Sequence, residues 1–498
     1  MNLAMLLEMA AEAFGERIAV GAEQTHYTYG QLWRAAQTAA QTFSASGCAY
    51  VALLDTNSVA APIAIFGAAL AGIPYVPLNY RLTKTELDEL LTRIAPAYLI
   101  ALDEYVAPLT LPAGVLCVER ERFIASVLDG AGIPSTAAGE PEDVAIQLFT
   151  SGTTGKPKAA LLRHQNLMAY ILGTIEFGSA SEDDAILVAV PPYHIAGISA
   201  VLSATYACRR TVQLPNFDAA EWLYLCASEN ISNAFLVPTM LTRIVDHLDS
   251  SNTVPQLPAL RAIAYGGGKM PQTIIERAMQ LFPDVAFTNA YGLTETSSTI
   301  CLLDPDDHRS AASSTDASIR KRLVSVGKPL ATVELQVRGE DGVAVGSNVI
   351  GDVYVRGDQV AGEYLGAGSL LDADGWFPTR DRGYLDDGGY LFLDGRADDV
   401  IVRGGENISP GEIEEVLLAH AAVIDAAVVA MPSQQWGETI AAAVVLKNNA
   451  ALAPAELQDW VKDRLRSSRV PERIIFKEQL PYNEMGKILR RVIKLEFQ

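Results

Sequence analysis

Short apolar runs alternate with helical patterns over the first part of the chain. Residues 50–56 (YVALLDT) and 97–102 (AYLIAL) have the uninterrupted apolar character of buried strands. Between them, leucine and isoleucine recur at helical spacing after Thr83 and Glu86, a pair with the spacing of an N-terminal capping box. Strands that alternate with helices indicate mostly parallel sheets with helices on both faces, so this pattern predicts an α/β fold.

The periodicity changes from about Val324. Residues 333–338 (VELQVR) and 351–357 (GDVYVRG) alternate apolar and polar side chains, and residues 384–396 (YLDDGGYLFLDGR) resemble a hairpin. Such alternation is typical of short antiparallel strands. We therefore expect a small antiparallel β region after the parallel sheets.

Another change comes near Gly395. Ser409 has the place of an N-cap, Pro410 stands at the first helical position, and Glu412 completes a capping-box pattern. Two strand-like runs and one further helical segment follow, at residues 424–431, 439–446 and 457–465. This last segment, of about a hundred residues, predicts a separate small α+β domain.

Composition narrows the classes of function. The chain has 498 residues, too many for one compact core, so two or more domains are expected. Its 38 basic and 59 acidic residues give a formal charge of −21, which argues against nucleic acid or an anionic membrane as a partner. The odd number of scattered cysteines favours a reducing compartment over a disulfide framework or a zinc site: Cys48, Cys117, Cys208, Cys226 and Cys301.

We expect neither a signal peptide nor a membrane span. The N-terminal residues lack a basic region, and Glu8 interrupts their apolar run. The longest apolar stretch, Ala60 to Leu78, is broken by three prolines and two glycines, which favours a core helix followed by a strand. The chain is therefore predicted to be cytoplasmic.

One polar loop, TSGTTGKPK at residues 150–158, has the chemistry for binding phosphate. Its glycines permit close backbone approach, and its hydroxyls and lysines supply donors and positive charge. It fails the Walker spacing, because Thr150 stands where glycine is needed and Pro157 follows Lys156 in place of Ser or Thr. Taken alone, a loop of this composition is more often an ordinary polar turn than a phosphate site.

Four further motifs follow this loop in order, namely YGGGKMP (265–271), NAYGLTET (289–296), FPTRDRGYLDDGGYLFLDGRADDVIVRGGENISPGEIE (377–414) and NEMGKILRR (483–491). The set resembles the adenylate-forming superfamily of acyl-CoA synthetases, carrier-loading adenylation domains and beetle luciferases. Chlorobenzoate-type and other acyl-CoA ligases look most similar, and the resemblance spans about residues 20–492. It implies a large domain over residues 1–397 and a small mobile domain over 398–498, with a hinge at Asp398.

The resemblance implies how ATP is bound. Tyr291 would lie against adenine, Thr294 would bond the α-phosphate, and Glu295 would help to hold Mg²⁺. Asp381 would bond the ribose hydroxyls, with Arg396 in support. The remainder of the implied ATP- and AMP-binding set is Thr150, Ser151, Gly152, Thr153, Thr154, Gly155, Lys156, Lys158, Gly266, Gly267, Gly268, Asn289, Ala290 and Gly292.

The same resemblance implies the catalytic residues. Lys487 matches a mobile lysine that bridges carboxylate and phosphate oxygens during adenylation, where it would act with Thr294 and Glu295. His194 matches a residue that gates the acyl carbonyl from the thiol tunnel, although a lone histidine is otherwise more often structural. The acyl pocket would be lined by His194, Ile195, Gly267, Gly268 and Lys269.

Coenzyme A is the expected acceptor of the acyl group. Trp436 matches a tryptophan that packs on the CoA nucleotide, and Arg81 matches a phosphate contact. Small residues in the turn of Arg403, Gly404, Gly405 and Glu406 would leave room for a pantetheine arm. A cluster of bases suits an anionic nucleotide, but would also suit an acidic carrier protein: Lys462, Arg464, Arg466, Arg469 and Arg473.

Three positions depart from the family pattern. Lys269 stands where relatives more often carry a small or hydroxyl residue. Arg380 replaces the glycine of a frequent Thr-Gly-Asp sequence, and Glu472 stands where a basic residue is common. None of these residues has an evident role from the sequence.

The implied reaction joins ATP and a carboxylic acid into an acyl-AMP with release of pyrophosphate, and then forms the acyl-CoA thioester. Residues 235–240 (FLVPTM) lack the aspartate that pairs with an α-ammonium in amino-acid-activating domains, so we expect an aromatic or medium-chain acid. The alternative is an adenylating enzyme that passes the acyl group to a carrier protein or an amine. A homodimer is also left open.

Overall fold

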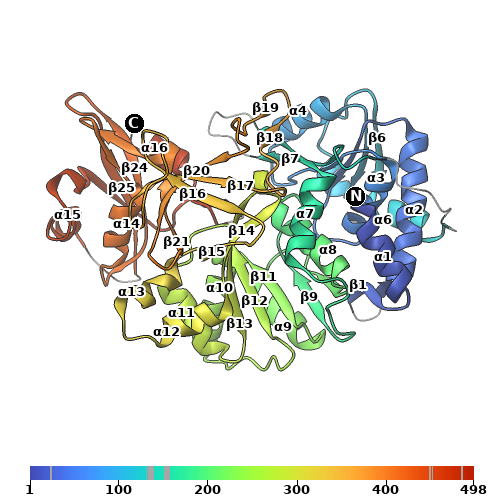
Figure 1. The fold of residues 1–498 in the computed structure, drawn as a ribbon, viewed down its shortest axis with the longest axis horizontal. Helices are drawn as coiled ribbons and strands as arrows, with labels where there is room; N and C mark the ends of the chain where they lie inside the picture. Colours follow the sequence, from blue (N-terminus) through green and yellow to red (C-terminus); the bar gives the residue numbers. More distant parts are fainter. Residues whose placement is uncertain are drawn as a thin grey trace.

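The structure, a computed structural model, describes residues 1–22, 25–130, 132, 139–150, 157–447, 450, 452–483 and 486–497. Two sheets with flanking helices form the large N-terminal part, and an antiparallel sheet follows them. A separate sheet forms the C-terminal part, which lies at the opposite end of the molecule from the first helices (Figure 1). This architecture confirms the predicted fold class.

The first sheet brings distant segments together. Its strands are β3 (Tyr50–Leu54), β4 (Tyr75–Pro77), β5 (Ala97–Ala101), β6 (Val115–Glu119), β7 (Val144–Thr150), β8 (Lys158–Arg163), β18 (Glu363–Tyr364) and β19 (Gly368–Ser369), in the order β19-β18-β8-β7-β4-β3-β5-β6. The strands from β7 to β6 are parallel neighbours, whereas β8 is antiparallel to both β7 and β18. Pairing of Tyr364 with Ala160 places a late segment beside the hairpin that carries the polar loop.

The second sheet is also parallel in its centre. Its strands are β1 (Ile18–Ala22), β2 (Thr25–Thr28), β9 (Ala185–Val188), β10 (Arg210–Gln213), β11 (Asn233–Leu236), β12 (Ala262–Gly266), β13 (Ala286–Leu293), β14 (Ser298–Leu303) and β15 (Lys328–Pro329). They lie in the order β15-β14-β13-β12-β11-β9-β10-β1-β2, with antiparallel pairs only at the two edges.

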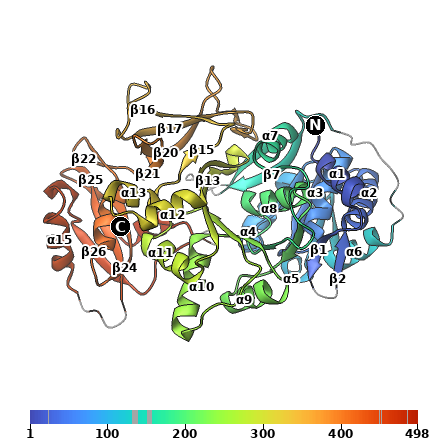
Figure 2. The same ribbon diagram turned by 60° about the horizontal axis from the view of Figure 1, so that its bottom comes forward.

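Helices pack around both sheets (Figure 1, Figure 2). They are α1 (Ala4–Phe14), α2 (Tyr29–Ser46), α3 (Ala60–Ala71), α4 (Lys84–Ile94), α5 (Asp103–Val106), α6 (Arg120–Leu128), α7 (His164–Thr174), α8 (Ile195–Tyr206), α9 (Ala219–Ser228), α10 (Pro238–Ser251), α11 (Gln272–Leu281), α12 (Pro305–Ser313) and α13 (Ala317–Arg320). The capping box of Thr83 and Glu86 starts α4, as predicted. The apolar stretch from Ala60 forms α3 and then β4, also as predicted.

None of the helices in the described ranges combines the length and the hydropathy that a membrane-spanning helix requires.

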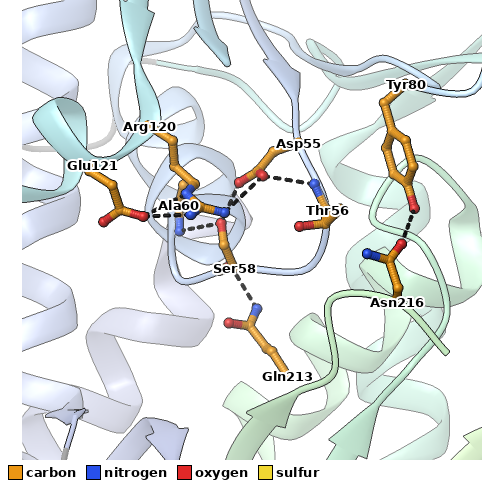
Figure 3. A network of polar contacts seen from close by, with 9 residues as sticks. All are labelled: Asp55, Thr56, Ser58, Ala60, Tyr80, Arg120, Glu121, Gln213 and Asn216. Carbon is orange, nitrogen blue, oxygen red and sulfur yellow. Dashed lines mark hydrogen bonds and ion pairs between the residues drawn. The ribbon is translucent and has the colours of Figure 1, made fainter. Parts of the chain in front are cut away.

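A buried carboxylate joins the two large sheets. Asp55, at the end of β3, is fully buried and accepts hydrogen bonds from Ser58, Arg120 and the backbone of Thr56 (Figure 3). Gln213 of β10 donates to the backbone oxygen of Ser58 at 2.7 Å, so the second sheet is tied to the same turn. Burial raises the pKa of Asp55, and its hydrogen bonds oppose that rise.

The predicted antiparallel region forms the third sheet. Its strands are β16 (Glu334–Arg338), β17 (Gly351–Arg356), β20 (Phe377–Leu385) and β21 (Leu391–Arg396), and all neighbours are antiparallel. The alternation seen in the sequence places the valines of β17 in the core, because successive side chains of a strand point to opposite faces.

The C-terminal sheet contains β22 (Ile401–Arg403), β23 (Glu406–Ile408), β24 (Val423–Ser433), β25 (Gly437–Leu446) and β26 (Arg473–Lys477). The helices of this part are α14 (Pro410–Leu418), α15 (Pro454–Lys462) and α16 (Arg490–Leu495). One apolar cluster forms with α14 and α15, and a second forms with α16, so both faces of the sheet are covered. The predicted α+β organisation is therefore present.

One detail of the prediction for α14 is wrong. Ser409 caps the helix and Pro410 occupies its first turn, but the Ser409 hydroxyl accepts from the backbone of Gly411 and not from that of Glu412. The Glu412 carboxylate pairs instead with Arg469, at 3.3 Å, so it does not close a capping box.

His164 anchors the N-terminal residues. It starts α7, is 2% exposed, and its Nδ1 accepts a hydrogen bond from the backbone of Leu3 at 3.2 Å. Burial lowers the pKa of His164 to about 4, against an ordinary value of about 6.5, and the charge of Asp143 only partly opposes this. The imidazole is therefore neutral in the folded protein at neutral pH.

This burial predicts a specific sensitivity to acid. Because the folded state holds the proton less readily than the unfolded state, stability from His164 is full above about pH 6.5 and is lost as the pH falls toward 4. The loss amounts to about 3 kcal/mol at most. In thermal denaturation between pH 7 and 4, His164→Asn should flatten the pH dependence of Tm. The exposed His247→Asn is the control, and an equal effect of both variants would contradict the assignment.

Candidate active site

Asp381 occupies a fixed position on β20. Its side chain is 7% exposed, and the Arg396 guanidinium donates to Oδ1 at 2.7 Å from the facing position of β21. The Thr379 hydroxyl accepts the backbone N–H of Asp381 and donates to the carbonyl of Val353. The carboxylate is therefore held in place by the strand pair and by the Arg396 guanidinium.

Tyr291 connects this carboxylate to the second large sheet. It lies on β13, and its hydroxyl donates to Oδ2 of Asp381 at 2.5 Å. Burial, followed by the charge of Asp381, raises the pKa of Tyr291 well above its ordinary value, so the phenol stays protonated. An ionised carboxylate has about four lone-pair sites, so Asp381 keeps acceptor capacity for a ligand hydroxyl.

Glu295 follows the same strand, in a short 3₁₀ turn over Thr294–Thr296. Its backbone oxygen accepts from Ala361 and Gly362, at 2.9 and 3.0 Å. Its carboxylate accepts a hydrogen bond from the hydroxyl of Tyr364. The segment around Tyr364 thus fixes both the backbone and the side chain of Glu295.

Tyr364 is a site residue that the sequence did not reveal. Burial, followed by the charge of Glu295, raises its pKa, so the hydroxyl remains a donor at neutral pH. The Lys158 ammonium lies 5.8 Å from the centre of the Tyr364 ring. The lysine, the tyrosine and Glu295 therefore form one neighbourhood at the base of the polar loop.

The polar loop itself is bracketed by β7 and β8. Thr150 and Lys158 face each other in the register of this hairpin, and the Thr150 hydroxyl donates to the carbonyl of Lys158 at 3.4 Å. The six predicted ligands between them, Ser151, Gly152, Thr153, Thr154, Gly155 and Lys156, lie outside the described residues. Both ends of the loop nevertheless emerge beside Tyr364.

Lys487 reaches this neighbourhood from the C-terminal part. Its hairpin is closed by hydrogen bonds between Asn483 and both backbone groups of Lys487. Partial burial and the positive charge of Arg396 lower the pKa of Lys487, while Asp381, Asp399 and Glu295 oppose the shift. The side chain nevertheless remains exposed, so it lines an open space and the effect of burial is moderated by solvent.

A steric contact fixes where the Lys487 hairpin lies. A Cβ atom built on Gly486 would sit 2.8 Å from Cγ2 of Thr239, in the first turn of α10, and Gly486 has a φ of +70°. Both facts favour glycine, because a side chain would strain the backbone and collide. This close fit between the two parts of the chain places Lys487 where Asp381 and Glu295 act electrostatically on its ammonium.

Glycines also shape the floor of the site. A Cβ on Gly266 would lie 2.1 Å from the carbonyl oxygen of Ala290, its partner in the β12–β13 register. A Cβ on Gly292 would lie 1.8 Å from the carbonyl oxygen of Ser298. The buried Asn289 turns its amide to the carbonyl of Ser325 at 2.9 Å, so its side chain supports the backbone.

The remaining residues of the glycine-rich motif differ in direction. Gly267 has a φ of +84°, a conformation that suits glycine, and Gly268 follows it. The Lys269 side chain points toward the C-terminal part, where it pairs with Glu415. In this arrangement its charge faces the neighbouring domain.

His194 and Arg81 belong to one aromatic series. The His194 ring lies 4.6 Å from Tyr193, which lies 5.4 Å from Tyr80, and the Arg81 guanidinium lies 5.5 Å from the Tyr80 ring. Figure 3 shows Tyr80 with its hydroxyl toward Asn216, to which it donates at 3.5 Å. His194 takes the N-cap position of α8, directly before Ile195, so one row of rings joins a residue of the predicted acyl pocket to a residue of the predicted CoA site.

The predicted CoA turn forms a second cluster. The backbone of Gly404, next to Gly405, donates to the carbonyl of Trp436 at 2.9 Å. The guanidinium of Arg403 lies 5.5 Å from the Trp436 ring and pairs with Glu472 at 2.6 Å. Glu406 pairs with Arg469. In the predicted basic cluster, Arg469 is thus paired with carboxylates, and Arg464 and Arg473 lie over the rings of Trp460 and Phe497.

The Lys487 hairpin and the Trp436 cluster lie at opposite ends of the C-terminal sheet. Tyr482 of the hairpin donates to Asp425, near the start of β24, at 2.7 Å. Trp436 follows the end of this strand, after Ser433, which is about 25 Å farther along at the usual rise per residue. The C-terminal part thus carries two chemically different surfaces.

Comparison with known proteins agrees with this geometry. A family model described as AMP-binding enzyme matches residues 7–365, and one described as AMP-binding enzyme C-terminal domain matches residues 412–487. The chain belongs to the AMP-binding enzymes. It is 32% identical to 2-succinylbenzoate–CoA ligase of Bacillus cereus over 454 residues, which is 89% of this chain and 87% of that protein.

Two other similarities cover nearly all of this AMP-binding enzyme. Feruloyl-CoA synthase of Amycolatopsis is 31% identical over 483 residues, with 95% of this chain and 94% of that protein covered. The structure of o-succinylbenzoate CoA synthetase of Bacillus subtilis, in complex with the acyl-adenylate intermediate, has a TM-score of 0.82 and 27% identity. That match covers 98% of this chain and 97% of the other.

The described residues offer one carboxylate, that of Glu295, as the expected protein ligand of a magnesium ion. Within the described ranges, no group of three or more histidine, cysteine, aspartate or glutamate side chains could hold a metal ion. Glu295 is a single carboxylate, and Mg²⁺ is commonly bound by one or two carboxylates together with phosphate oxygens. A magnesium ion would therefore enter with ATP, whose phosphates would complete its ligands.

Proposed function

We propose that the chain is an AMP-forming acid–CoA ligase that uses ATP to activate a carboxylic acid. The observation that carries this proposal is that Asp381 and Glu295 act electrostatically on Lys487, whose hairpin packs against Thr239 of the large part, while the Trp436 cluster lies at the other end of the same small domain. Two such surfaces suit two successive half-reactions. The relatives named above are acid–CoA ligases, which supports the same reaction.

In the first half-reaction the carboxylate attacks the α-phosphorus of ATP and pyrophosphate leaves. Asp381, held by Tyr291 and Arg396, would accept from the ribose hydroxyls. Lys487 would stabilise the charge that develops on the oxygens around the reacting phosphorus. Glu295 would hold Mg²⁺ and Thr294 would contact the α-phosphate, while the loop after Thr150 would bind the leaving pyrophosphate.

In the second half-reaction the thiol of CoA attacks the acyl-AMP and releases AMP. The C-terminal domain, residues 398–498, would reorient about Asp398 so that its Arg403 turn replaces Lys487 at the site. Trp436 and Arg81 would contact the CoA nucleotide, and His194 would stand between the acyl group and the incoming thiol.

An aromatic carboxylic acid is the substrate class that we favour. The relatives named above act on 2-succinylbenzoate or form feruloyl-CoA, according to their names, and both acyl groups derive from aromatic acids. The aromatic series from Tyr80 to His194 supplies flat apolar surfaces near the expected acyl position. We further propose that the enzyme works in the cytoplasm, where ATP and CoA are at hand and unpaired cysteines persist.

The proposal is tested by a pyrophosphate-release screen across aromatic and aliphatic acids with CoA present. We expect pyrophosphate and AMP to form with at least one aromatic acid, together with the corresponding acyl-CoA. Turnover with a carrier protein or an amine, but none with CoA, would replace the proposal by its alternative. Failure of every acid to support ATP–pyrophosphate exchange would contradict adenylation altogether.

Removing the Lys487 ammonium should separate the half-reactions. Lys487→Ala should slow adenylation by ~10²–10³-fold, because one preorganised donor to the transition state is lost. Thioester formation from presynthesised acyl-AMP and CoA should change little, since the other surface acts there. Each half-reaction is measured alone, and an equal loss in both would contradict the two-surface mechanism.

A disulfide should trap the arrangement seen here. Thr239→Cys removes the Cγ2 atom with which a side chain at residue 486 would collide. The Cβ atoms of residues 239 and 486 would then lie 3.5 Å apart, within the range of natural disulfides, so Thr239→Cys with Gly486→Cys should cross-link on oxidation. The cross-linked protein should retain ATP–pyrophosphate exchange and lose thioester formation from acyl-AMP, and reductant should restore it. Thr239→Cys alone, and the double variant kept reduced, are the controls. Full thioester formation in the trapped state would show that reorientation is unnecessary.

A further inference from the structure

Two residues that depart from the family pattern form ion pairs with the C-terminal part. Lys269 and Arg380 both lie in the large domain, and both pair with a carboxylate of the C-terminal part. The Lys269 ammonium lies 2.9 Å from Oε1 of Glu415, and the Arg380 guanidinium lies 3.8 Å from Oδ2 of Asp398. The sequence alone assigns no role to either residue. In the structure, both side chains extend toward the C-terminal part.

Glu415, the partner of Lys269, lies on a helix that is packed within the C-terminal part. It lies on α14, whose start is tied to the large domain by a hydrogen bond from Ser409 to the carbonyl of Asp394, at 2.6 Å. The neighbouring Glu414 pairs with Arg490 of α16. Because Glu415 belongs to this packed unit, its distance from Lys269 depends on how the whole C-terminal domain is oriented.

Arg380 adopts a backbone conformation that disfavours a side chain. Its φ is +62°, in the left-handed region that costs free energy for residues other than glycine. Relatives often have glycine at this position, where a positive φ costs little, whereas the backbone of Arg380 is strained. Its guanidinium then reaches Asp398, the expected hinge, and also acts electrostatically on Tyr364 beside Glu295.

Resting on the proposed function, we propose that Lys269 and Arg380 are positioning residues for adenylation. Their ion pairs with Glu415 and Asp398 bias the C-terminal domain toward the orientation that presents Lys487. Both pairs join the large domain to the C-terminal part, so reorientation for thioester formation must break or rearrange them. Exposed pairs of this kind shift an equilibrium by a factor of roughly two to five each.

The first test measures orientation without any substrate. In the protein that carries Thr239→Cys and Gly486→Cys, the rate of disulfide formation reports how often the two residues meet. Lys269→Gln and Arg380→Gln should each slow this cross-linking by about two- to five-fold in low salt, with a smaller effect in high salt. Arg277→Gln is the matched control, because it removes a partly exposed ion pair with Asp249 that lies inside the large domain.

A charge exchange tests the pair directly. Lys269→Glu should slow cross-linking further, and addition of Glu415→Lys should restore most of the rate. Unchanged cross-linking in Lys269→Gln and Arg380→Gln, or an equal change in Arg277→Gln, would overturn the proposal. This result does not depend on which acid or acceptor the enzyme uses, so it is distinct from failure of the proposed function.

The second test compares the two half-reactions in the natural chain, which has Thr239 and Gly486 and lacks the two introduced cysteines. Lys269→Gln and Arg380→Gln should lower the rate of ATP–pyrophosphate exchange by about two- to five-fold. Thioester formation from supplied acyl-AMP should stay equal or rise by a similar factor. Lys269→Arg should rescue exchange because it keeps the charge. Equal losses in both half-reactions would indicate a general structural defect and overturn the positioning role.

Discussion

The carboxylate of Asp381 is the constraint on which the rest of the site depends. It accepts from Tyr291 of the second sheet and from Arg396 at the end of the antiparallel sheet, immediately before the C-terminal domain. Lys487 lies within electrostatic reach of the same carboxylate. Three regions of the chain therefore converge on one carboxylate, two of them by hydrogen bonds and the third by electrostatic attraction.

This convergence matters more in a protein with a net charge of −21. Anionic substrates meet a repulsive background, so the positive groups must be concentrated where phosphate binds. Of the positive groups near Asp381 and Glu295, Arg396 pairs with Asp381 and Arg380 pairs with Asp398, while Lys158 lies over the Tyr364 ring and Lys487 is within electrostatic reach. On the far end of the C-terminal sheet, Arg403 and Arg469 are held by acidic partners in the same manner.

Local patterns predicted the elements well, because period and capping depend on neighbours in sequence. The α/β order, the antiparallel strands and the start of α4 all followed from them. The sequence predictions were wrong or incomplete where a side chain forms its contact with a residue far away in the sequence. Glu412 pairs with Arg469, 57 residues later, and Tyr364 reaches Glu295 across 69 residues. Lys269 finds Glu415 across 146 residues, and no local pattern could reveal that contact.

The motifs supplied the candidate ligands only through their resemblance to a family, since a lone aspartate or lysine carries no signal of its own. The structure adds their mutual geometry, and with it one restriction on sequence change. Thr239 and Gly486 share a single small volume at the junction of two domains, although 247 positions separate them in the chain. A bulkier residue at either position would hold the domains apart, so these two positions should vary together, as a correlated pair, among homologous sequences.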